Sequence, residues 1–551
     1  MKKSFIIIVL LITPILAQCD WNEDGDVDVL DIVSTVDCIM TGCWDGTQCD
    51  WNEDGAIDVL DIVSTVDCIM NGCWVGEDIY GCTDPDATNF DPEATIDDGS
   101  CTYNRELTIF YTNDEHGWMI RENGSGGGAE LMGQWREVEG YTDDGPFLIL
   151  SGGDNWTGPA ISTWFQGESM VDMMNAMQYD ASTIGNHEFD FGQDELQARL
   201  DQADYPFLSA NMVLEDTGEL SPLATAFVIK EVNNINVGII GLTTTVADDI
   251  NFPYNVENID FIEYVGVLNE VVPEVQAQGA ELLVVISHIC LNQMEALVPV
   301  LNELGIALIG GGHCHQPAAE MMDGVGIILG GSNMSSYAKV EIEFNTLYDV
   351  VNSIEVSTAY NQGLYMDEDV AAVVEYWQEQ MDNELSQVIG YLDEQVGQSS
   401  DAMFNLITDA WLEIYPADIS MTNRGGIRQP MPAGEITFET WVGILPFENF
   451  IVEIELTGQE LIDNIGYLVV GGMTTIPDYL LADGTPIEMD ETYSVLLTDY
   501  IYATNSNFSD LDPTPYETSI HWRQPVIDWI NSLNTTPENP LDNYLDYEPR
   551  Q

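Results

Sequence analysis

The sequence predicts an α/β protein built in layers, preceded by a small, cysteine-rich helical module. From about residue 105 onward, apolar runs typical of buried strands alternate with stretches of helical periodicity. Eight of the ten cysteines lie between Cys19 and Cys101, ahead of this region. In the same N-terminal stretch, residues 19–44 and 49–74 are near-identical copies that repeat with a period of 30. Two kinds of structure are therefore expected along the chain.

The length of 551 residues and the changes of composition along it indicate several domains. We expect a signal peptide over 1–17, a calcium-binding repeat over 18–76, a Cys-bounded acidic linker over 77–104, a first α/β domain over 105–360, a linking helix over 361–390, a second α/β domain over 391–535 and a tail over 536–551. The helical pattern of the linker runs from about Asp367 to Gln387.

The charge of the chain is extreme, with 95 Asp and Glu against 12 Lys and Arg and a formal net charge of −83. A nucleic-acid polymer is excluded as a partner, because phosphate contacts need basic residues. Two interpretations of the acidity remain open. It can be a solvated surface suited to saline surroundings, or it can bind cations where carboxylates stand at ligand spacing.

The first residues have the pattern of a secretory signal, since Lys2 and Lys3 precede a short apolar run and Ala17 follows it. That run is too short to span a membrane, and no later run is long enough either, so no transmembrane segment is expected. A secreted, extracellular, periplasmic or surface-associated protein is predicted. Cysteine use agrees with an oxidising compartment: disulfides should staple the N-terminal module, while the large domains rely on their cores.

Each copy of the repeat opens with Asp-x-Asn-x-Asp-Gly and places further Asp residues at loop positions 9 and 12. Calcium takes six to eight oxygen ligands, which alternate residues of such a loop can supply. The expected ligands are Asp20, Asn22, Asp24, Asp28 and Asp31 in the first copy, and Asp50, Asn52, Asp54, Asp58 and Asp61 in the second. A helix should follow each loop, since apolar residues recur there at helical spacing. The alternative is an Asp-rich linker without metal.

The repeat resembles a dockerin, the paired calcium-loop module that docks onto cohesin partners. The resemblance implies bound Ca²⁺ and a cohesin-like or cell-surface partner. Residues 81–101, which follow, are acidic and lack an apolar period. We expect this segment to be a linker closed by Cys82 and Cys101.

Five of the six histidines lie in four short motifs, each directly after an apolar run. The motifs are LTIFYTNDEHG with Asp114 and His116, STIGNHEFDFG with Asn186, His187 and Asp190, LLVVISH with His288, IALIGGGHCH with His313 and His315, and a fifth without histidine, LILSGGDNWTG with Asp154. Loops after the strands of an α/β sheet open at one edge, so these groups can converge there. Imidazole, carboxylate and amide groups together suit a pair of divalent metals.

The spacing of His313 and His315 predicts that both face one side of an extended segment, with Cys314 pointing away and not a ligand. The alternative for any single histidine is an ordinary core or surface residue. For five of six, all after apolar runs, that alternative is disfavoured.

These motifs resemble the calcineurin-like metallophosphoesterases, and more closely the 5′-nucleotidase and UDP-sugar hydrolase family, over about residues 105–535. The resemblance implies a four-layer metallophosphoesterase sandwich and an α/β 5′-nucleotidase C-terminal domain. It implies two transition metal ions, of Zn, Mn, Co or Fe. One metal would be held by Asp114, His116, Asp154 and His315, and the other by Asp154, Asn186, His288 and His313, with Asp154 bridging.

The chemistry implied by the resemblance is attack on phosphorus by a hydroxide that the two metals activate. His187 would stabilise the developing charge and protonate the leaving alkoxide, with Asp190 orienting its ring.

The second α/β domain carries the substrate-binding positions that the resemblance implies. They are Asn423, Arg424, Arg428, Phe447 and Tyr500. Two arginines within five positions are unusual in so acidic a chain and indicate a site that binds an anion. The alternative is that both are ordinary surface residues. The two aromatic rings would sandwich a nucleobase. Two positions depart from the family pattern, because Gly397 stands where an arginine is usual and Ser506 where a sugar-binding aspartate is usual.

The sequence therefore predicts a secreted hydrolase that releases phosphate from nucleoside 5′-monophosphates or related nucleotides. Two alternatives use the same scaffold, a 2′,3′-cyclic-nucleotide phosphodiesterase and a UDP-sugar diphosphatase. A third alternative belongs to another class, a calcium-dependent surface or scaffold protein with a vestigial catalytic site.

Overall fold

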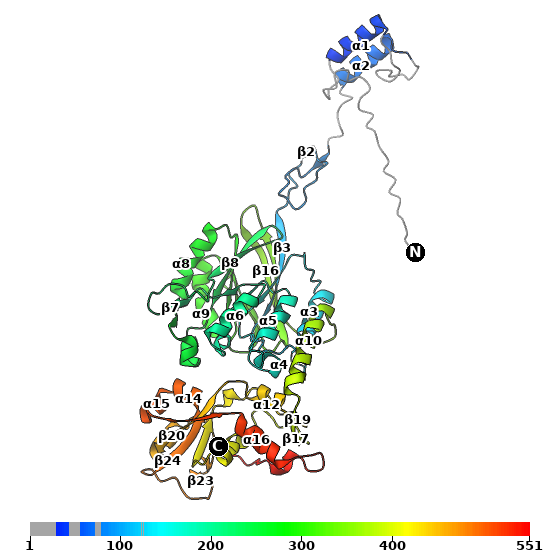
Figure 1. Ribbon diagram of the computed structural model, residues 1–551. Coiled ribbons are helices and arrows are strands. Elements are labelled where there is room, and N and C mark those ends of the chain that lie inside the picture. Colours follow the sequence, from blue (N-terminus) through cyan, green and yellow to red (C-terminus); the bar gives the residue numbers. More distant parts are fainter. Residues whose placement is uncertain (1–28, 43–55, 72–78, 123, 125) are drawn as a thin grey trace. The chain divides into compact units, whose positions relative to one another are not determined.

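The computed structural model describes residues 29–42, 56–71, 79–122, 124 and 126–551 (Figure 1). The chain divides into two compact units, Met1–Tyr103 and Asn104–Gln551. We call them the N-terminal unit and the C-terminal unit. Seven of the expected calcium ligands lie outside the described residues: Asp20, Asn22, Asp24, Asp28, Asp50, Asn52 and Asp54.

The N-terminal unit contains the two helices expected after the loops, α1 (Val29–Thr41) and α2 (Val59–Asn71). Helix α1 buries Asp31, Thr35 and Cys38, whereas Val33 and Met40 are 60% and 80% exposed. The apolar positions that predicted the helix therefore lie largely on its solvent side. Of the expected calcium ligands, the structure describes Asp31, Asp58 and Asp61, and both Asp31 and Asp61 are fully buried.

A disulfide between Cys82 and Cys101 closes the acidic segment, as predicted. Two short parallel strands, β1 (Tyr80–Gly81) and β2 (Ile96–Asp97), pair inside it. Several carboxylates accept hydrogen bonds from backbone N–H groups two residues further on, as at Asp84 and Asp91. These local bonds and the disulfide replace the apolar core that so small an acidic segment lacks.

Two six-stranded sheets form the first part of the C-terminal unit. One has the order β16-β15-β3-β4-β5-β6 and the other β13-β14-β12-β11-β9-β8. The first consists of β3 (Asn104–Thr112), β4 (Phe147–Ser151), β5 (Ala181–Thr183), β6 (Phe207–Leu208), β15 (Ser336–Asn345) and β16 (Val350–Tyr360). The second consists of β8 (Phe227–Val232), β9 (Ile235–Leu242), β11 (Leu282–Ser287), β12 (Ile306–Gly310), β13 (Pro317–Met322) and β14 (Val325–Gly330).

The two sheets pack face to face and are covered by helices on their outer faces, which confirms the predicted four-layer α/β sandwich. A buried cluster that includes Ile109, Leu150, Ile239 and Ile286 fills the space between the sheets. Strand β11 is buried at every position, as expected for a parallel strand covered on both faces. The outer helices are α3 (Gly128–Glu137), α5 (Glu168–Ala176) and α6 (Gln193–Gln202) beside the first sheet, and α8 (Tyr264–Ala277) and α9 (Leu291–Glu303) beside the second (Figure 1).

The predicted linking helix is α10 (Glu368–Leu385). The side chain of Asp367 caps it by accepting hydrogen bonds from the backbone N–H groups of Asp369 and Val370, which lack partners within the helix. Its buried side, with Trp377 and Met381, packs into the same apolar cluster as α3 and α5.

A five-stranded sheet of order β21-β18-β24-β20-β25 forms the centre of the remaining residues. Its strands are β18 (Ile419–Thr422), β20 (Phe450–Thr457), β21 (Val469–Gly471), β24 (Thr492–Thr498) and β25 (Tyr516–His521). Helices α11 (Asp401–Ile414), α12 (Phe438–Ile444) and α16 (Gln524–Leu533) share one buried cluster, and α13 (Gly458–Asn464), α14 (Asp499–Thr504) and α15 (Ser506–Leu511) border another. The last residues pack back on this region, where Arg550 forms a two-pronged ion pair with Asp409.

The large domains do not rely on their cores alone, which corrects the expectation from cysteine use. Cys290 and Cys314 form a disulfide inside the C-terminal unit. Only two cysteines follow residue 101, and so small a number did not predict a disulfide in this region. Two cysteines are nevertheless enough to form one. No helix in the described part of the chain has the length and hydropathy needed to cross a bilayer.

Candidate active site

The predicted metal-ligating residues follow the carboxyl ends of five parallel strands in the two sheets. Strand β3 ends before Asp114 and His116, β4 before Asp154, β5 before Asn186, β11 before His288 and β12 before His313 and His315. The packing of the sheets brings their edges together, so residues far apart in the sequence become neighbours. The tertiary structure thus assembles the convergence that the motifs suggested.

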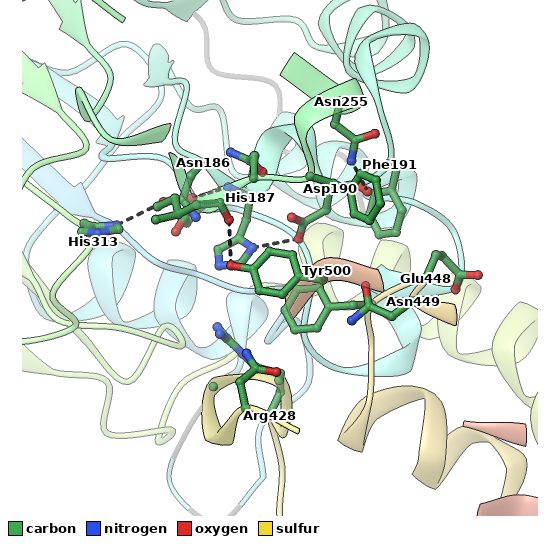
Figure 2. A pocket seen from close by; sticks show the side chains of 18 of the residues that line it. Asn186, His187, Asp190, Phe191, Asn255, His313, Arg428, Glu448, Asn449 and Tyr500 are labelled. Atoms are coloured by element: carbon green, nitrogen blue, oxygen red, sulfur yellow. Dashed lines mark hydrogen bonds and ion pairs between the residues drawn. The ribbon is translucent and has the colours of Figure 1, made fainter. Parts of the chain in front are cut away.

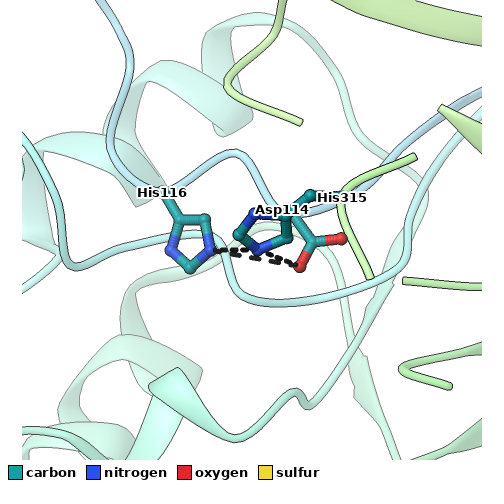
Figure 3. A group of neighbouring side chains, drawn as sticks. All are labelled: Asp114, His116 and His315. Atoms are coloured by element: carbon teal, nitrogen blue, oxygen red, sulfur yellow. Dashed lines mark hydrogen bonds and ion pairs between the residues drawn. The ribbon is translucent and has the colours of Figure 1, made fainter. Parts of the chain in front are cut away.

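One group of side chains comprises Asp114, His116 and His315 (Figure 3). The Nε2 atoms of His116 and His315 are 3.1 Å apart, and His315 Nε2 lies 3.3 Å from Asp114 Oδ1. Two ring nitrogens and a carboxylate oxygen that point at one another form a donor set for a divalent cation, because imidazole and carboxylate are the ligands that such cations take.

A second group comprises Asp154, His288 and His313, with Asn186 beside it. His288 is fully buried, and its Nδ1 lies 2.7 Å from the carbonyl oxygen of Gly152. Its Nε2 is therefore directed at Asp154 Oδ2, at 3.0 Å. Burial opposes charge on this ring, but the adjacent Asp154 carboxylate outweighs it and raises the pKa of His288 to about 10. The pocket electrostatically favours a positive charge at this point.

A third group consists of His116, Asp154 and His187. It links the first group, through His116, to the second group, through Asp154. A pair of divalent cations fits this arrangement: the donors are imidazole and carboxylate, the two carboxylates are buried, and Asp154 stands in two of the three groups. Five residues of these groups have left-handed backbone conformations that are uncommon for non-glycine residues. Their φ angles are 53° at Asp114, 45° at His116, 58° at Asp154, 70° at His313 and 55° at His315.

The expectation that His313 and His315 lie in an extended segment is wrong. Both have positive φ angles, so the chain turns between them and the two rings enter different groups. His313 Nδ1 lies 3.0 Å from Asn186 Oδ1, while His315 faces Asp114. Cys314 is withdrawn from the ligand set by its disulfide to Cys290.

Glu188 connects the loops that carry Asp154 and Asn186. One carboxylate oxygen accepts hydrogen bonds from the backbone N–H and side-chain amide of Asn155, at 2.8 and 2.9 Å. The other accepts the backbone N–H groups of Asp154 and Gly185, at 3.0 and 2.6 Å. Burial, together with the charge of Asp154, raises the pKa of Glu188 to about 7. The sequence shows this glutamate only as part of a motif, and its role emerges from the fold.

His187 and Asp190 form the predicted pair, with His187 Nδ1 2.8 Å from Asp190 Oδ2 (Figure 2). The backbone N–H of His187 donates to Asp154 Oδ1 at 2.8 Å, which fixes the ring relative to the metal groups. Burial opposes protonation, but Asp190 and Asp154 outweigh it and raise the pKa of His187. The ring can therefore hold a proton beside the site.

A cavity of about 340 Å³ opens on these groups. Its lining includes Asp154, Asn186, His187, Asp190, His313 and His315 from the two-sheet region, and Asn423, Arg428, Phe447 and Tyr500 from the region of the five-stranded sheet (Figure 2). Arg428 Nη2 lies 3.2 Å from His116 Nε2, so the guanidinium faces the metal groups. Phe447 lies against the His187 ring, with centroids 5.8 Å apart, and the Tyr500 hydroxyl donates to Ile250 O at 2.9 Å.

Arg424, the other predicted substrate-binding arginine, does not line this cavity. Its guanidinium stacks over Phe404 at 4.6 Å and donates to the carbonyl oxygen of Tyr467 at 3.2 Å. Its neighbour in sequence, Asn423, does reach the cavity. The two arginines of the motif therefore diverge, because a 3₁₀ turn over Arg424–Gly426 separates them.

Sequence reasoning missed one wall of the cavity. Phe252, Tyr254 and Asn255, in the loop after β9, line it together with Glu448 and Asn449. Phe252 and Tyr254 form an aromatic pair with centroids 4.3 Å apart. The signal in the sequence was an aromatic and amide-rich loop after a buried strand, at the sheet edge where the histidine motifs also end.

Known proteins resemble this chain in sequence and in fold. Residues 385–467 match the family described as 5′-nucleotidase, C-terminal domain. A Bacillus subtilis (strain 168) protein named Endonuclease YhcR is 27% identical over 449 residues, which cover 72% of this chain but only 37% of that protein. A 5′-nucleotidase of Vibrio vulnificus is 24% identical over 489 residues, covering 74% of this chain and 87% of the relative.

The fold has a counterpart among solved structures. A 5′-nucleotidase precursor from Thermus thermophilus superimposes with a TM-score of 0.68 at 22% identity, covering 81% of this chain and 99% of that one. These likenesses support the 5′-nucleotidase family. The matching family model and the Vibrio vulnificus relative carry the name of the hydrolase class that the motifs predicted, and the Thermus thermophilus structure has the same fold. They do not bear on the N-terminal repeat.

Proposed function

We propose that this protein is a divalent-metal-dependent hydrolase that releases phosphate from nucleoside 5′-monophosphates or closely related nucleotides. The observation that carries the proposal is the composition of one cavity. Asp154, His313 and His315 line it beside the proton-holding His187, and Arg428, Phe447 and Tyr500 complete it. Groups suited to a phosphoryl centre thus share a cavity with rings suited to a flat base.

The proposed ligands are Asp114, His116, Asp154 and His315 for one cation, and Asp154, Asn186, His288 and His313 for the other. When bound, the two cations would supply Lewis acidity and an activated water-derived nucleophile. Arg428 would bind a phosphoryl oxygen, because its partly buried guanidinium lines the cavity and faces the metal groups. His187 would donate its proton to the leaving oxygen, with Asp190 holding the ring through Nδ1.

The cavity favours a single phosphoryl group. Among the described residues that line it, Arg428 is the one arginine, and no lysine accompanies it. Arg424 is turned away from the cavity, and Gly397 stands where the resembled family has an arginine. Glu448 lines the cavity as the partner of Arg523 in an ion pair. A longer polyphosphate would meet fewer cations than its charge demands. We therefore place nucleoside monophosphates ahead of UDP-sugars. A 2′,3′-cyclic nucleotide also carries a single phosphoryl group, so the assay below separates it from AMP.

The test is hydrolysis by the full-length protein of AMP, a 2′,3′-cyclic nucleotide and a UDP-sugar, each with added manganese, cobalt or zinc. Adenosine and phosphate are measured as products of AMP, the 2′- or 3′-nucleotide as product of the cyclic nucleotide, and UMP with sugar 1-phosphate as products of the UDP-sugar. The proposal expects AMP to give the highest kcat/KM. A preference for either alternative would keep the hydrolase but replace its substrate. Complete inactivity on all three, with metals bound, would favour the vestigial surface or scaffold protein instead.

The N-terminal unit is proposed to bind Ca²⁺ through the repeats over 18–76 and to attach the enzyme to a cohesin-like or cell-surface partner. Support comes from the loop spacing and from the helices that follow, α1 and α2. The signal-like residues 1–17 support a secreted protein. The division into a linker over 77–104, domains over 105–360 and 391–535, a helix over 361–390 and a tail over 536–551 also remains a proposal.

A further inference from the structure

The disulfide between Cys290 and Cys314 joins two loops of the candidate metal site. Cys290 is the N-cap residue of α9 and stands two residues after His288. Cys314 stands between His313 and His315 in the loop that leads from β12 to β13. One covalent bond therefore connects the segments that carry three of the proposed ligands.

The end of the bond at Cys290 is firmly anchored. Ile289 before it is fully buried, and Cys290 begins α9 with a capping box in which its backbone N–H donates to Gln293 Oε1 at 3.3 Å. The helix itself packs on the second sheet through Met294 and Leu297. The backbone of Cys290 is thus held in place by α9, so a disulfide to Cys290 can restrain a less firmly held segment.

The end at Cys314 lies in a loop with weaker attachments. Gly311 and Gly312 donate backbone hydrogen bonds to Ile328 O and Ile289 O, at 2.9 and 3.1 Å. Further along, Cys314 N donates to Gly312 O at 2.8 Å, which is a bond within the loop itself. Cys314 is exposed, and the His315 side chain is 44% exposed. The part of the loop that presents His315 thus lies at the protein surface, beyond the last bond from its backbone to another segment, which His313 N–H donates to Asp114 Oδ1 at 3.1 Å.

The backbone of this loop also needs an external restraint. His313 and His315 have φ angles of 70° and 55°, a left-handed conformation that is disfavoured for residues with a Cβ atom. Such conformations persist when the surroundings hold them in place. The disulfide acts on the residue between the two, so a single bond restrains both rings.

We propose that the Cys290–Cys314 disulfide is a positioning element of the metal site. It holds His313 beside Asp154 and His315 beside Asp114, so that each ring can share a divalent cation with its carboxylate. The inference rests on the proposed function, because it assumes that these groups bind metal. Outer residues that orient metal ligands contribute about 10–100-fold to metal affinity, and the same range is expected here.

The experiment is a cobalt(II) titration of metal-free, full-length protein in excess calcium, followed by visible absorption and by the metal content after dialysis. C290A/C314A should bind cobalt about 10–100-fold more weakly than the wild type. Its hydrolysis of AMP should return at saturating cobalt, because His187 and Arg428 are untouched. The matched control is C82A/C101A, which removes the other described disulfide and should bind cobalt with wild-type affinity.

The outcomes separate this inference from the proposed function. A wild type that fails to take up two cobalt ions contradicts the metal site itself. Wild-type cobalt affinity in C290A/C314A overturns the positioning role while the enzyme proposal stands. C290S/C314S gives a second replacement, and the metal-free melting temperature of each variant reports its folding. If neither variant folds, the bond is a general staple of the domain and the inference is wrong.

Discussion

Replacing Glu188 by glutamine tests whether its carboxylate holds the two metal-site loops together. The substitution preserves shape but converts one oxygen into an amide NH₂ group. Each oxygen accepts two N–H donors, from Asn155 on one side and from Asp154 and Gly185 on the other. Whichever way the amide is oriented, two buried donors lose their acceptor. A buried unsatisfied donor costs about 1–3 kcal/mol, so two of them should lower the free energy of unfolding by about 2–6 kcal/mol.

The measurement is differential scanning calorimetry of metal-free protein. A loss of about 2–6 kcal/mol corresponds to a fall in melting temperature of about 5 °C or more for the transition of the two-sheet region. The metal content after dialysis should fall as well, since Asp154 and Asn186 are carried by the loops that Glu188 joins. Glu375→Gln is the matched control, because Glu375 is exposed on α10 and the same chemical change there should leave both readouts unchanged.

A wild-type melting temperature in the Glu188→Gln variant would contradict this role of Glu188. If Glu188→Gln melts within about 1 °C of the wild type and retains its metal, the four hydrogen bonds do not hold the loops. Glu188→Ala would then be expected to be mild too, and the rigidity of the site would have to come from the sheets alone.

The remaining predictions concern the metals, the acid, the base clamp and calcium. Chelation should abolish activity, and added manganese, cobalt or zinc should restore it. Among the ligand substitutions, Asp154→Asn should lower activity most. Fewer than two transition metal ions per active chain would contradict the two-metal site. His187→Asn should keep its metal content but lower kcat by about 10²–10⁴, measured on AMP, and an unchanged kcat would remove His187 as the acid. Phe447→Ala and Tyr500→Ala should raise KM for AMP about tenfold and leave the hydrolysis of p-nitrophenyl phosphate nearly unchanged. Equal losses of activity on both esters would indicate a structural role for the rings. Tyr500→Phe is the control that keeps the ring but removes its hydrogen bond to Ile250 O. Equilibrium dialysis should find two calcium ions that disappear, with catalysis intact, when residues 18–76 are deleted; an unchanged calcium content would exclude the repeats.

Local patterns in the sequence determined much of the fold. Apolar runs such as Leu282–Ser287 predicted buried strands, and the polar residues after each run were therefore expected at one sheet edge. The helix after Asp367 followed from its apolar period and its cap. These features depend on neighbours in sequence, so a single chain reveals them. The kinds of side chain at the site, and the class of chemistry they suit, were readable for the same reason.

The tertiary structure decided which of these groups meet. The resemblance assigned His313 and His315 to different metals, but the turn of the backbone that separates the two rings appears only in the structure. Arg428 reaches the cavity, while Arg424 stacks on Phe404. The wall from Phe252 to Asn255 and the disulfide from Cys290 to Cys314 join segments whose proximity no local pattern encodes. Periodicity specifies the face of an element, but contacts between distant segments arise only when the sheets pack and bring their edges together.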